Sequence, residues 1–559
     1  MSNYEKEGRP IQRRGMRQPW NEEDPRLFAE AVIAWYLSSA DNTENEWRLS
    51  RAYTERRLST ADTEKEGRRL SSADTEFEPD THDSHFVDWD GPDDPANPRN
   101  WSTGIRVGHV VIVSLITLIV NLGSTMFAPG ADQMLAEFKE TNTVVAQLSV
   151  TIYLLGFVVG PLVVAPLSEL YGRLWIYHIC NAIFLGFAIG CALAKNMPMF
   201  IVFRFITGCA GSAPLTIGGG TVADVMPQEK RGAAMAVFAM GPLLGPVIGP
   251  VIGGFLSQEL DWRWAFWLLA MISGTISFIS LFVMRETNGR VLLRRKAAHL
   301  RKTTGDTKLR TATELDLTPA QLLLRAVVRP AKLLMLSPIV LSLSLFCAFV
   351  FGLVFLLFTT FPSVFKQRYG FSPGIAGLAY LGLGIGMLFG LVLFGVLSDK
   401  VLGRMAKARA AAAQAAGATG EDAAPQPEYR LPLMVWFAPA MPIGIFWYGW
   451  SAYKHVHWLV PIVGTSFIGL GALFVVMPAQ IYLVDAFDVE GAASALAANT
   501  IVRSLFGTFL PLAGPKMYAA LGMGWGNTLL GFLALAFAPV PIVFYKYGRY
   551  IRTRWAVKL

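Results

Sequence analysis

Charged residues are scarce in this chain, and acidic residues inside its apolar stretches are scarcer still. Asp, Glu, Lys and Arg make up 16% of the 559 residues, whereas 53% of the residues are hydrophobic. This balance excludes an ordinary soluble protein and predicts a polytopic membrane protein. No Asp or Glu falls in the middle of an apolar stretch. That absence argues against a carrier of polyamines, because a desolvated cation needs carboxylates around it.

Features that would indicate an enzyme or a bound cofactor are also missing. All four cysteines lie in apolar runs and are better interpreted as buried thiols than as disulfides. The chain has no Gly-x-x-x-x-Gly-Lys-Ser/Thr loop, so ATP is not expected to drive it. No nucleophile–base spacing is seen, and His455 and His457 have no further metal ligands nearby. We therefore expect no enzyme activity, no cofactor and no metal site.

Twelve apolar stretches are each long enough to cross a bilayer as a helix. The first six lie at about 107–129, 144–165, 175–194, 199–223, 232–256 and 264–284. The second six lie at about 337–361, 374–397, 431–451, 457–479, 491–513 and 525–545. The expected fold class is an all-α polytopic membrane protein of two six-helix pseudo-repeats. The expected divisions are a tail at 1–105, bundles at 106–285 and 336–546, a linker at 286–335 and a second tail at 547–559.

The distribution of basic residues predicts the orientation in the membrane. An even number of spans places both termini on one side. Lys and Arg concentrate on that side, in the linker, in the 398–430 loop and in the C-terminal tail. The positive-inside rule makes this side the cytosol. The net charge of +8 is thus an orientation signal and does not indicate a nucleic-acid partner.

The first 105 residues are polar and are expected to be mostly disordered. A nine-residue sequence at 56–64 recurs at 68–76, and each copy places two arginines shortly before a serine, Ser59 or Ser71. This spacing resembles a basophilic kinase site, so a kinase is one expected partner. Simple drift of a solvated tail explains the repeat about equally well.

Residues 241–254 form the most specific stretch of the chain. Gly241, Gly245, Gly249 and Gly253 recur every fourth residue, Gly254 follows, and Pro242, Pro246 and Pro250 repeat at the same spacing. Glycines on one helical face let a neighbouring backbone approach closely. In a membrane, neighbouring helices can satisfy the carbonyls that the prolines leave free. The pattern therefore predicts a bent, tightly packed membrane helix.

The two halves repeat each other in sequence as well as in hydropathy. Val222-Ala223-Asp224 follows the fourth apolar stretch, and Leu483-Val484-Asp485 follows the tenth. Turns after the second and eighth stretches carry an acid and a later arginine. They contain Glu169, Gly172 and Arg173 in the first half, and Asp399 and Arg404 in the second. Six-span repeats place a substrate path between the halves, near the bilayer midplane.

Two arginines fall inside apolar stretches, Arg204 in the fourth and Arg503 in the eleventh. Intramembrane charges are costly and functional by default, although a structural ion pair or bonds to carbonyls would also explain them. An arginine holds its proton, so it would bind an acidic partner or substrate, or tune a neighbour. Aromatic and amide side chains are candidates to line an apolar substrate cavity together with Arg503. They are Asn121, Gln147, Tyr153, Phe351, Phe355, Tyr380 and Asn499.

Together these residues resemble the fungal twelve-span drug:proton antiporters of the major facilitator superfamily. The resemblance covers about 85–555 and rests on the 241–254 stretch, the two turns, Arg204 within 203–211 and the proline-rich segment at 87–102. It implies proton-coupled efflux of amphipathic drugs, fungicides or toxic metabolites across the plasma membrane by a monomer. It also implies proton coupling through Arg204, a cytosolic gate at the two turns, and a glycine face packed against the other half. A polyamine or other small-metabolite carrier and a transporter-like sensor remain as alternatives.

Overall fold

The computed structural model describes residues 86–91, 93–311, 318–415, 426–487, 489–555 and 557, which are the basis of every statement below. The two serines of the predicted kinase sites lie outside these residues. In the described part the long elements are all helices, and the β-structure is one isolated bridge between Phe86 and Arg310. The expected all-α class is confirmed.

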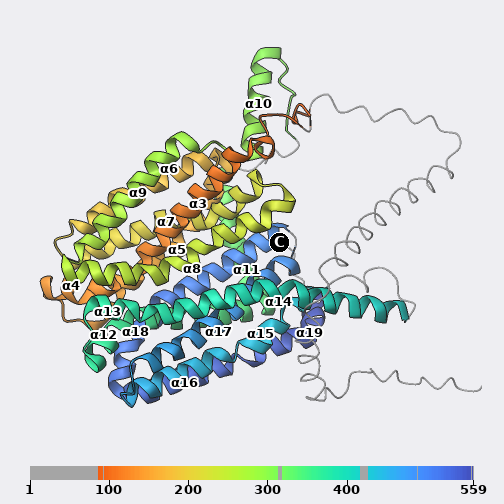
Figure 1. Cartoon of the computed structure of the whole chain (residues 1–559). Coiled ribbons are helices and arrows are strands. Elements are labelled where there is room, and N and C mark those ends of the chain that lie inside the picture. Colours follow the sequence, from red (N-terminus) through yellow and green to blue (C-terminus); the bar gives the residue numbers. More distant parts are fainter. Residues whose placement is uncertain are drawn as a thin grey trace, which may run out of the picture. The chain divides into compact units, whose positions relative to one another are not determined.

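The first bundle contains six long helices, and they follow the predicted apolar stretches. They are α3 (Thr103–Thr125), α5 (Thr143–Tyr171), α6 (Arg173–Ala192), α7 (Met197–Val225), α8 (Gln228–Glu259) and α9 (Arg263–Val283). Two short elements, η2 (Ala128–Gly130) and α4 (Ala131–Glu137), join α3 to α5. In Figure 1 these helices, coloured orange to yellow-green, occupy the upper part of the molecule.

The second bundle repeats this arrangement with more interruptions. Its helices are α12 (Pro338–Tyr369), α13 (Pro373–Leu378) with α14 (Tyr380–Ala415), α15 (Pro432–Phe437) with α16 (Ala440–Tyr453), α17 (Leu459–Ala486), α18 (Val489–Ala536) and α19 (Pro539–Arg554). Short breaks at 379 and 438–439 divide its second and third spans. The short helix η4 (Pro427–Arg430) precedes α15.

Eleven helical segments of the described chain are long and apolar enough to cross a membrane. The last of them runs from Gly491 to Arg554, 64 residues. At 1.5 Å per residue that would be roughly 96 Å, about three times the apolar thickness of a bilayer. Gly522, with φ 71°, breaks it inside α18. The segment is therefore two spans, and the total is the twelve that the sequence predicts.

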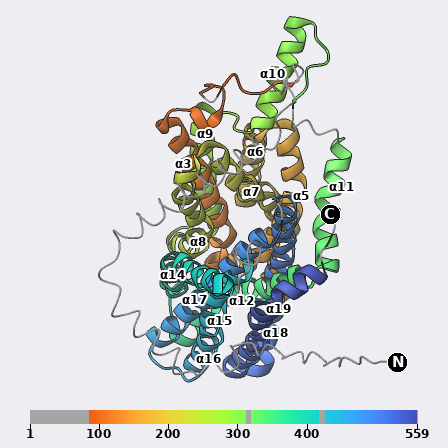
Figure 2. The same cartoon turned by 90° about the vertical axis from the view of Figure 1, so that its right-hand side faces the viewer.

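Two helices of the linker have different positions. The basic helix α10 (Gly289–Thr304) projects from one end of the first bundle, while α11 (Pro319–Leu336) packs along α5 and α18 (Figure 2). We call the end that carries α10 the linker end. The opposite end, which carries η2 and α4, is the far end. Because α11 contacts a helix of each bundle, it connects the halves along the side of the molecule.

The segment before the first span is ordered, which differs from the expectation of a tail up to residue 105. Lys296 of α10 donates to the Asp88 carbonyl at 2.8 Å and pairs with Asp90 at 2.6 Å. Val87 donates its N–H to the carbonyl of Arg310. The prolines of this segment prevent a longer α-helix, so that only the 3-10 turn η1 (Pro98–Asn100) forms. The basic linker supplies partners for its acids. The described residues from Phe86 to Asp90 are thus held against the linker.

Candidate functional site: the helix interfaces of the two halves

The glycine face of α8 lies against α3, within its own half. A side chain on Gly245 would meet Asn121 at 2.6 Å, and one on Gly249 would meet the Leu122 carbonyl at 2.8 Å. At Gly253 a side chain would collide with the carbonyl of Met126. The expectation that this face packs against the other half is therefore wrong for the four glycines in register. The four glycines contact successive turns of α3, from Thr117 to Met126, because the two helices run side by side.

The prolines of α8 leave carbonyls free, and α3 satisfies one of them. Pro250 has no N–H to donate to the carbonyl of Pro246, four residues earlier. The hydroxyl of Thr125 donates to that carbonyl at 3.0 Å. The helix remains continuous from Gln228 to Glu259 despite three internal prolines. A partner helix thus replaces the missing intrahelical bond, as expected for a membrane bundle.

The two halves meet at the far end through α8 and the pair α13–α14. A side chain on Gly254 would meet the carbonyl of Pro373 at 2.5 Å, and one on Gly377 would meet the carbonyl of Pro250 at 2.6 Å. The N–H of Gly374 donates to Gln258 at 3.1 Å. Asp132 and Lys366 form a further ion pair between the halves at 3.6 Å. Backbone therefore faces backbone where the halves close.

At the linker end of the first half, Arg173 is paired with Asp224. Its Nε lies 3.0 Å from the Asp224 carboxylate, and its Nη1 donates to the carbonyl of Ile217 at 2.9 Å. The expected gate acid Glu169 is exposed and has no hydrogen bond or ion pair to another described residue. Arg173 thus joins the third span to the fourth, and Glu169 is free.

Glu286 caps the start of α6. Its carboxylate accepts from the N–H of Arg173 at 2.9 Å and of Leu174 at 3.3 Å, at the start of α6. It also accepts from its own loop, at the N–H groups of residues 287 and 288. Gly172 has φ 98°, and a side chain there would collide with this carboxylate. Glycine is therefore required at position 172, both for the positive φ and for the space that the Glu286 carboxylate occupies.

The second half contains the same ion pair with different residues. Arg430 Nε lies 3.0 Å from the carboxylate of Asp485, and its Nη1 lies 3.9 Å from Asp399. Arg404 is exposed and does not contact Asp399. Arg430 precedes the third span of its half, as Arg173 begins the third span of the first. Sequence reasoning missed Arg430, although the repeat of Asp224 as Asp485 indicated that the arginine should also be repeated.

Arg204 is fully buried in the first bundle, and main-chain carbonyls surround its guanidinium. It donates to the carbonyls of Gly123 at 2.8 Å, Ser124 at 3.3 Å and Val150 at 3.2 Å. Its guanidinium carbon lies 4.8 Å from the centre of the Tyr153 ring. Arg204 therefore ties α3, α5 and α7 together, and none of its described partners is acidic.

The residues expected to line a cavity fall into two groups. Asn121, Tyr153 and Tyr380 are buried inside one half or the other. The Tyr153 hydroxyl donates to the Val120 carbonyl at 2.8 Å, and the Tyr380 hydroxyl donates to the Phe358 carbonyl at 2.6 Å. In both halves a tyrosine of the second span thus forms a hydrogen bond to the main chain of the first span. Asn121 donates to the carbonyl of residue 117 and lies under Gly245.

The second group gathers where α12 meets α18. The Phe351 and Phe355 rings lie 4.8 Å apart, and the Arg503 guanidinium carbon lies 4.8 Å from the centre of Phe351. Asn499 is one helical turn before Arg503, buried. Gln147 of α5 is half-buried, and its side-chain oxygen has no hydrogen bond within the described chain. Four of the candidates thus lie on α12 and α18, namely Phe351, Phe355, Asn499 and Arg503, whereas Gln147 lies on α5.

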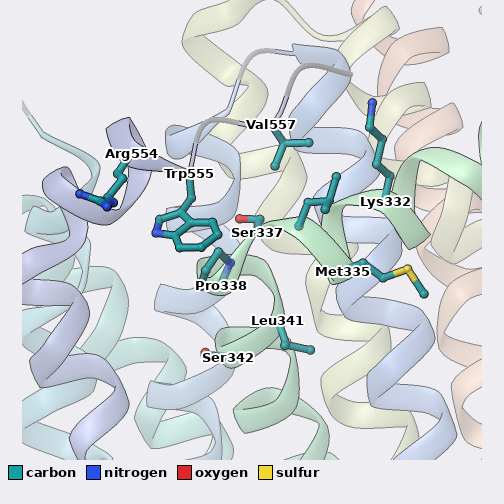
Figure 3. A pocket seen from close by; sticks show the side chains of 10 residues that line it. Lys332, Met335, Ser337, Pro338, Leu341, Ser342, Arg554, Trp555 and Val557 are labelled. Atoms are coloured by element: carbon teal, nitrogen blue, oxygen red, sulfur yellow. The ribbon is translucent and has the colours of Figure 1, made fainter.

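A cavity of about 460 Å³ lies away from these residues, at the linker end (Figure 3). The end of α11, the start of α12 and the C-terminal residues line it, including Lys332, Pro338 and Trp555. Sequence reasoning named none of its lining residues. In the part of the chain that the structure describes, no cluster of three or more His, Cys, Asp or Glu could hold a metal ion.

Residues 113–511 match the family model described as Major Facilitator Superfamily. The chain belongs to this superfamily. It is therefore a multi-pass membrane transporter, not an enzyme. The superfamily fold consists of two six-span bundles that are internal structural repeats. This repetition accounts for the ion pairs and the tyrosines that recur in both halves.

Fungal members of the superfamily are close in sequence. The MFS transporter prlG of Fungal sp. (strain NRRL 50135) is 58% identical over 472 residues, which cover 84% of this chain and 97% of that protein. The trichosetin biosynthesis cluster MFS transporter of Gibberella fujikuroi is 52% identical over 473 residues, which cover 85% of this chain and 90% of that protein. Identity at this level over most of both chains places this protein among fungal superfamily transporters.

Solved superfamily structures share the fold. A D-xylose-proton symporter has a TM-score of 0.58 at 18% identity, with 78% of this chain and 97% of that chain covered. The partially occluded, inward-open form of the xylose transporter XylE from E. coli has a TM-score of 0.58 at 17% identity, with 80% and 98% covered. At this identity the likeness establishes the architecture alone.

Proposed function

We propose that this transporter exports amphipathic organic molecules, such as toxic metabolites or drugs, from the cytosol across the plasma membrane in exchange for protons. The observation that carries the proposal is the glycine–proline helix α8. Its glycines bring α3 within backbone contact, and Gly254 meets Pro373 of the other half. Such a helix lets backbone approach backbone at the far end and still lets neighbouring helices slide. The relative whose name places it in the trichosetin biosynthesis cluster supports a metabolite as cargo.

The mechanism we infer is rocking of the two halves about the seam between them. The far-end contacts of Gly374 with Gln258, and of Lys366 with Asp132, hold the halves together on one side. At the linker end Glu169 is free. We assign the linker end to the cytosol from its excess of Lys and Arg. The arrangement then corresponds to a state that receives cargo from the cytosol, with the gate residues apart.

Proton coupling would use acids at the linker end, since the spans carry none at mid-depth. Asp224 is an acid at that end whose side chain is only partly exposed to solvent, and its partner Arg173 begins α6. Arg204 would act indirectly, because it fixes α3, α5 and α7 through three carbonyls. A shift of one of these helices changes the contacts of the others through Arg204.

The test is efflux of Nile red, a neutral amphipathic dye, from yeast cells that lack their own drug pumps. Cells that express this chain should retain less dye, and a protonophore should abolish the difference. Arg204→Ala, compared at equal surface expression, should lose export. Export that continues in the presence of the protonophore would show a transporter that does not depend on proton exchange. Dye uptake in place of export would show that the proposed direction is wrong. Lys454→Gln, at an exposed position of the far-end loop, is the matched control for loss of a cation.

A further inference from the structure

Arg503 lies at the seam between the two halves, near the middle of the part of α18 that runs from Val489 to Gly522. One turn after it, a side chain on Gly507 would meet Leu154 of α5 and Phe351 of α12, each at 2.9 Å. The first half, through α5, and the second half, through α12, thus both approach this face of α18. The Arg503 guanidinium carbon lies over the Phe351 ring at 4.8 Å.

This guanidinium has no anionic partner in the described chain. The helices α5, α12 and α18 contain only two acidic residues, Glu169 and Glu490, and both are at helix ends. Arg503 makes no hydrogen bond to a described residue, and its Nε is buried without a partner. Arg204, in contrast, donates to three carbonyls. Neither intramembrane arginine has an acidic partner among the described residues, but only Arg503 also lacks partners for most of its donors.

Neighbouring polar atoms are unsatisfied too. The side-chain oxygens of Asn499 and Ser504 on α18, and of Ser344 on α12, are buried without hydrogen-bond partners. Cys347 lies beside both Asn499 and Arg503. Buried polar atoms without partners are rare, and each costs free energy unless something binds them. An unpaired cation with an unsatisfied amide oxygen one helical turn away, at Asn499, indicates a site for a ligand.

We propose that Arg503 binds an ionised acidic group of the cargo, and that the transported class is amphipathic organic acids. The proposal rests on the proposed function and adds the charge of the substrate. A guanidinium can hold a planar carboxylate through two parallel hydrogen bonds. Phe351 and Phe355 offer an aromatic surface to the apolar part of the molecule. A cationic cargo would face Arg503 with no carboxylate to offset the repulsion.

The experiment compares two probes that differ in one charge, 11-(dansylamino)undecanoic acid and its methyl ester. Binding to the purified full-length chain in nanodiscs is followed by dansyl fluorescence at neutral pH. The acid should bind at least tenfold more tightly than the ester. Arg503→Gln should remove this preference, whereas Lys454→Gln should preserve it. Arg503→Lys should retain part of it, since the charge remains and the paired donors are lost.

Equal affinity for acid and ester in the unmodified chain, or no binding of the acid, would overturn the proposal whether or not any variant folds. A preference that persists in Arg503→Gln would also overturn it. Nile red efflux from the same chain separates this outcome from failure of the proposed function. Export of the neutral dye without acid preference would leave an exporter whose selectivity does not depend on Arg503.

Discussion

Thr125 of α3 donates its hydroxyl to the main-chain carbonyl of Pro246 of α8 across 3.0 Å. Replacement of Thr125 by valine keeps the shape and removes the donor. Interhelical hydrogen bonds in membranes contribute about 0.6 kcal/mol on average and up to about 1.7. We expect a loss of stability in this range, measured as a lower melting temperature of the detergent-solubilised protein by size-exclusion chromatography. An unchanged melting temperature would show that the free carbonyl costs nothing.

Gly253→Ala should abolish transport and lower stability, because a side chain there collides with the carbonyl of Met126. The control is Gly232→Ala in the same helix, where a side chain would meet nothing within 4 Å. Nile red efflux at matched surface expression measures both variants. Equal activity of the two would contradict the close contact between α3 and α8.

Glu286→Gln should destabilise the first bundle by about 2 kcal/mol, since the carboxylate accepts four backbone N–H groups and hydrogen bonds to charged groups are strong. Glu169→Gln should change stability by less than about 0.5 kcal/mol, because Glu169 is exposed and free. Thermal unfolding in detergent distinguishes them. If Glu169 is a gate residue, its substitution lowers efflux all the same.

The pairs Arg173–Asp224 and Arg430–Asp485 should behave alike in double-mutant cycles. Each pair has an Nε–carboxylate distance of 3.0 Å. Because all four side chains are partly exposed, we expect a coupling of about 0.5 to 1 kcal/mol within each pair. Efflux and melting temperature of the single and double variants provide the coupling. Additive effects in one pair only would show that the two halves use these ion pairs differently.

Docking of the segment before the first span should depend on pH through Asp94. The N–H groups of Asp90 and Ala96, and then Lys296, hold the pKa of Asp94 below its usual value. A lowered folded-state pKa means that the contribution of Asp94 is present above the usual aspartate value, about 3.9, and is lost as pH falls through the lowered pKa. Hydrogen exchange at the amide of Ala96 should be slow at neutral pH and fast in Asp94→Asn. Equal protection in this variant would show that Asp94 does not hold the segment.

The spans could be predicted because a membrane helix is specified locally, by about 20 apolar residues in a row. The contacts at the linker end could not, because Glu169 and Glu286 are both acids near Arg173 in the fold, and only the three-dimensional path of a loop 113 residues later decides which one caps α6. Arg430 was missed because it lies at the end of the 398–430 loop, far in sequence from both Asp399 and Asp485. The glycine spacing identified a close contact but not its partner, since a bare helix face fits any backbone.

The glycine face of α8 also has a consequence for how cargo selectivity can change over time. A surface that consists of backbone alone cannot distinguish one molecule from another. In the proposed site, substitutions that change the cargo would accumulate around Phe351 and Arg503, on α12 and α18, while the contact between α3 and α8 stays the same. In the proposed mechanism, related transporters would share the glycine face of α8 and would differ in the side chains around Phe351.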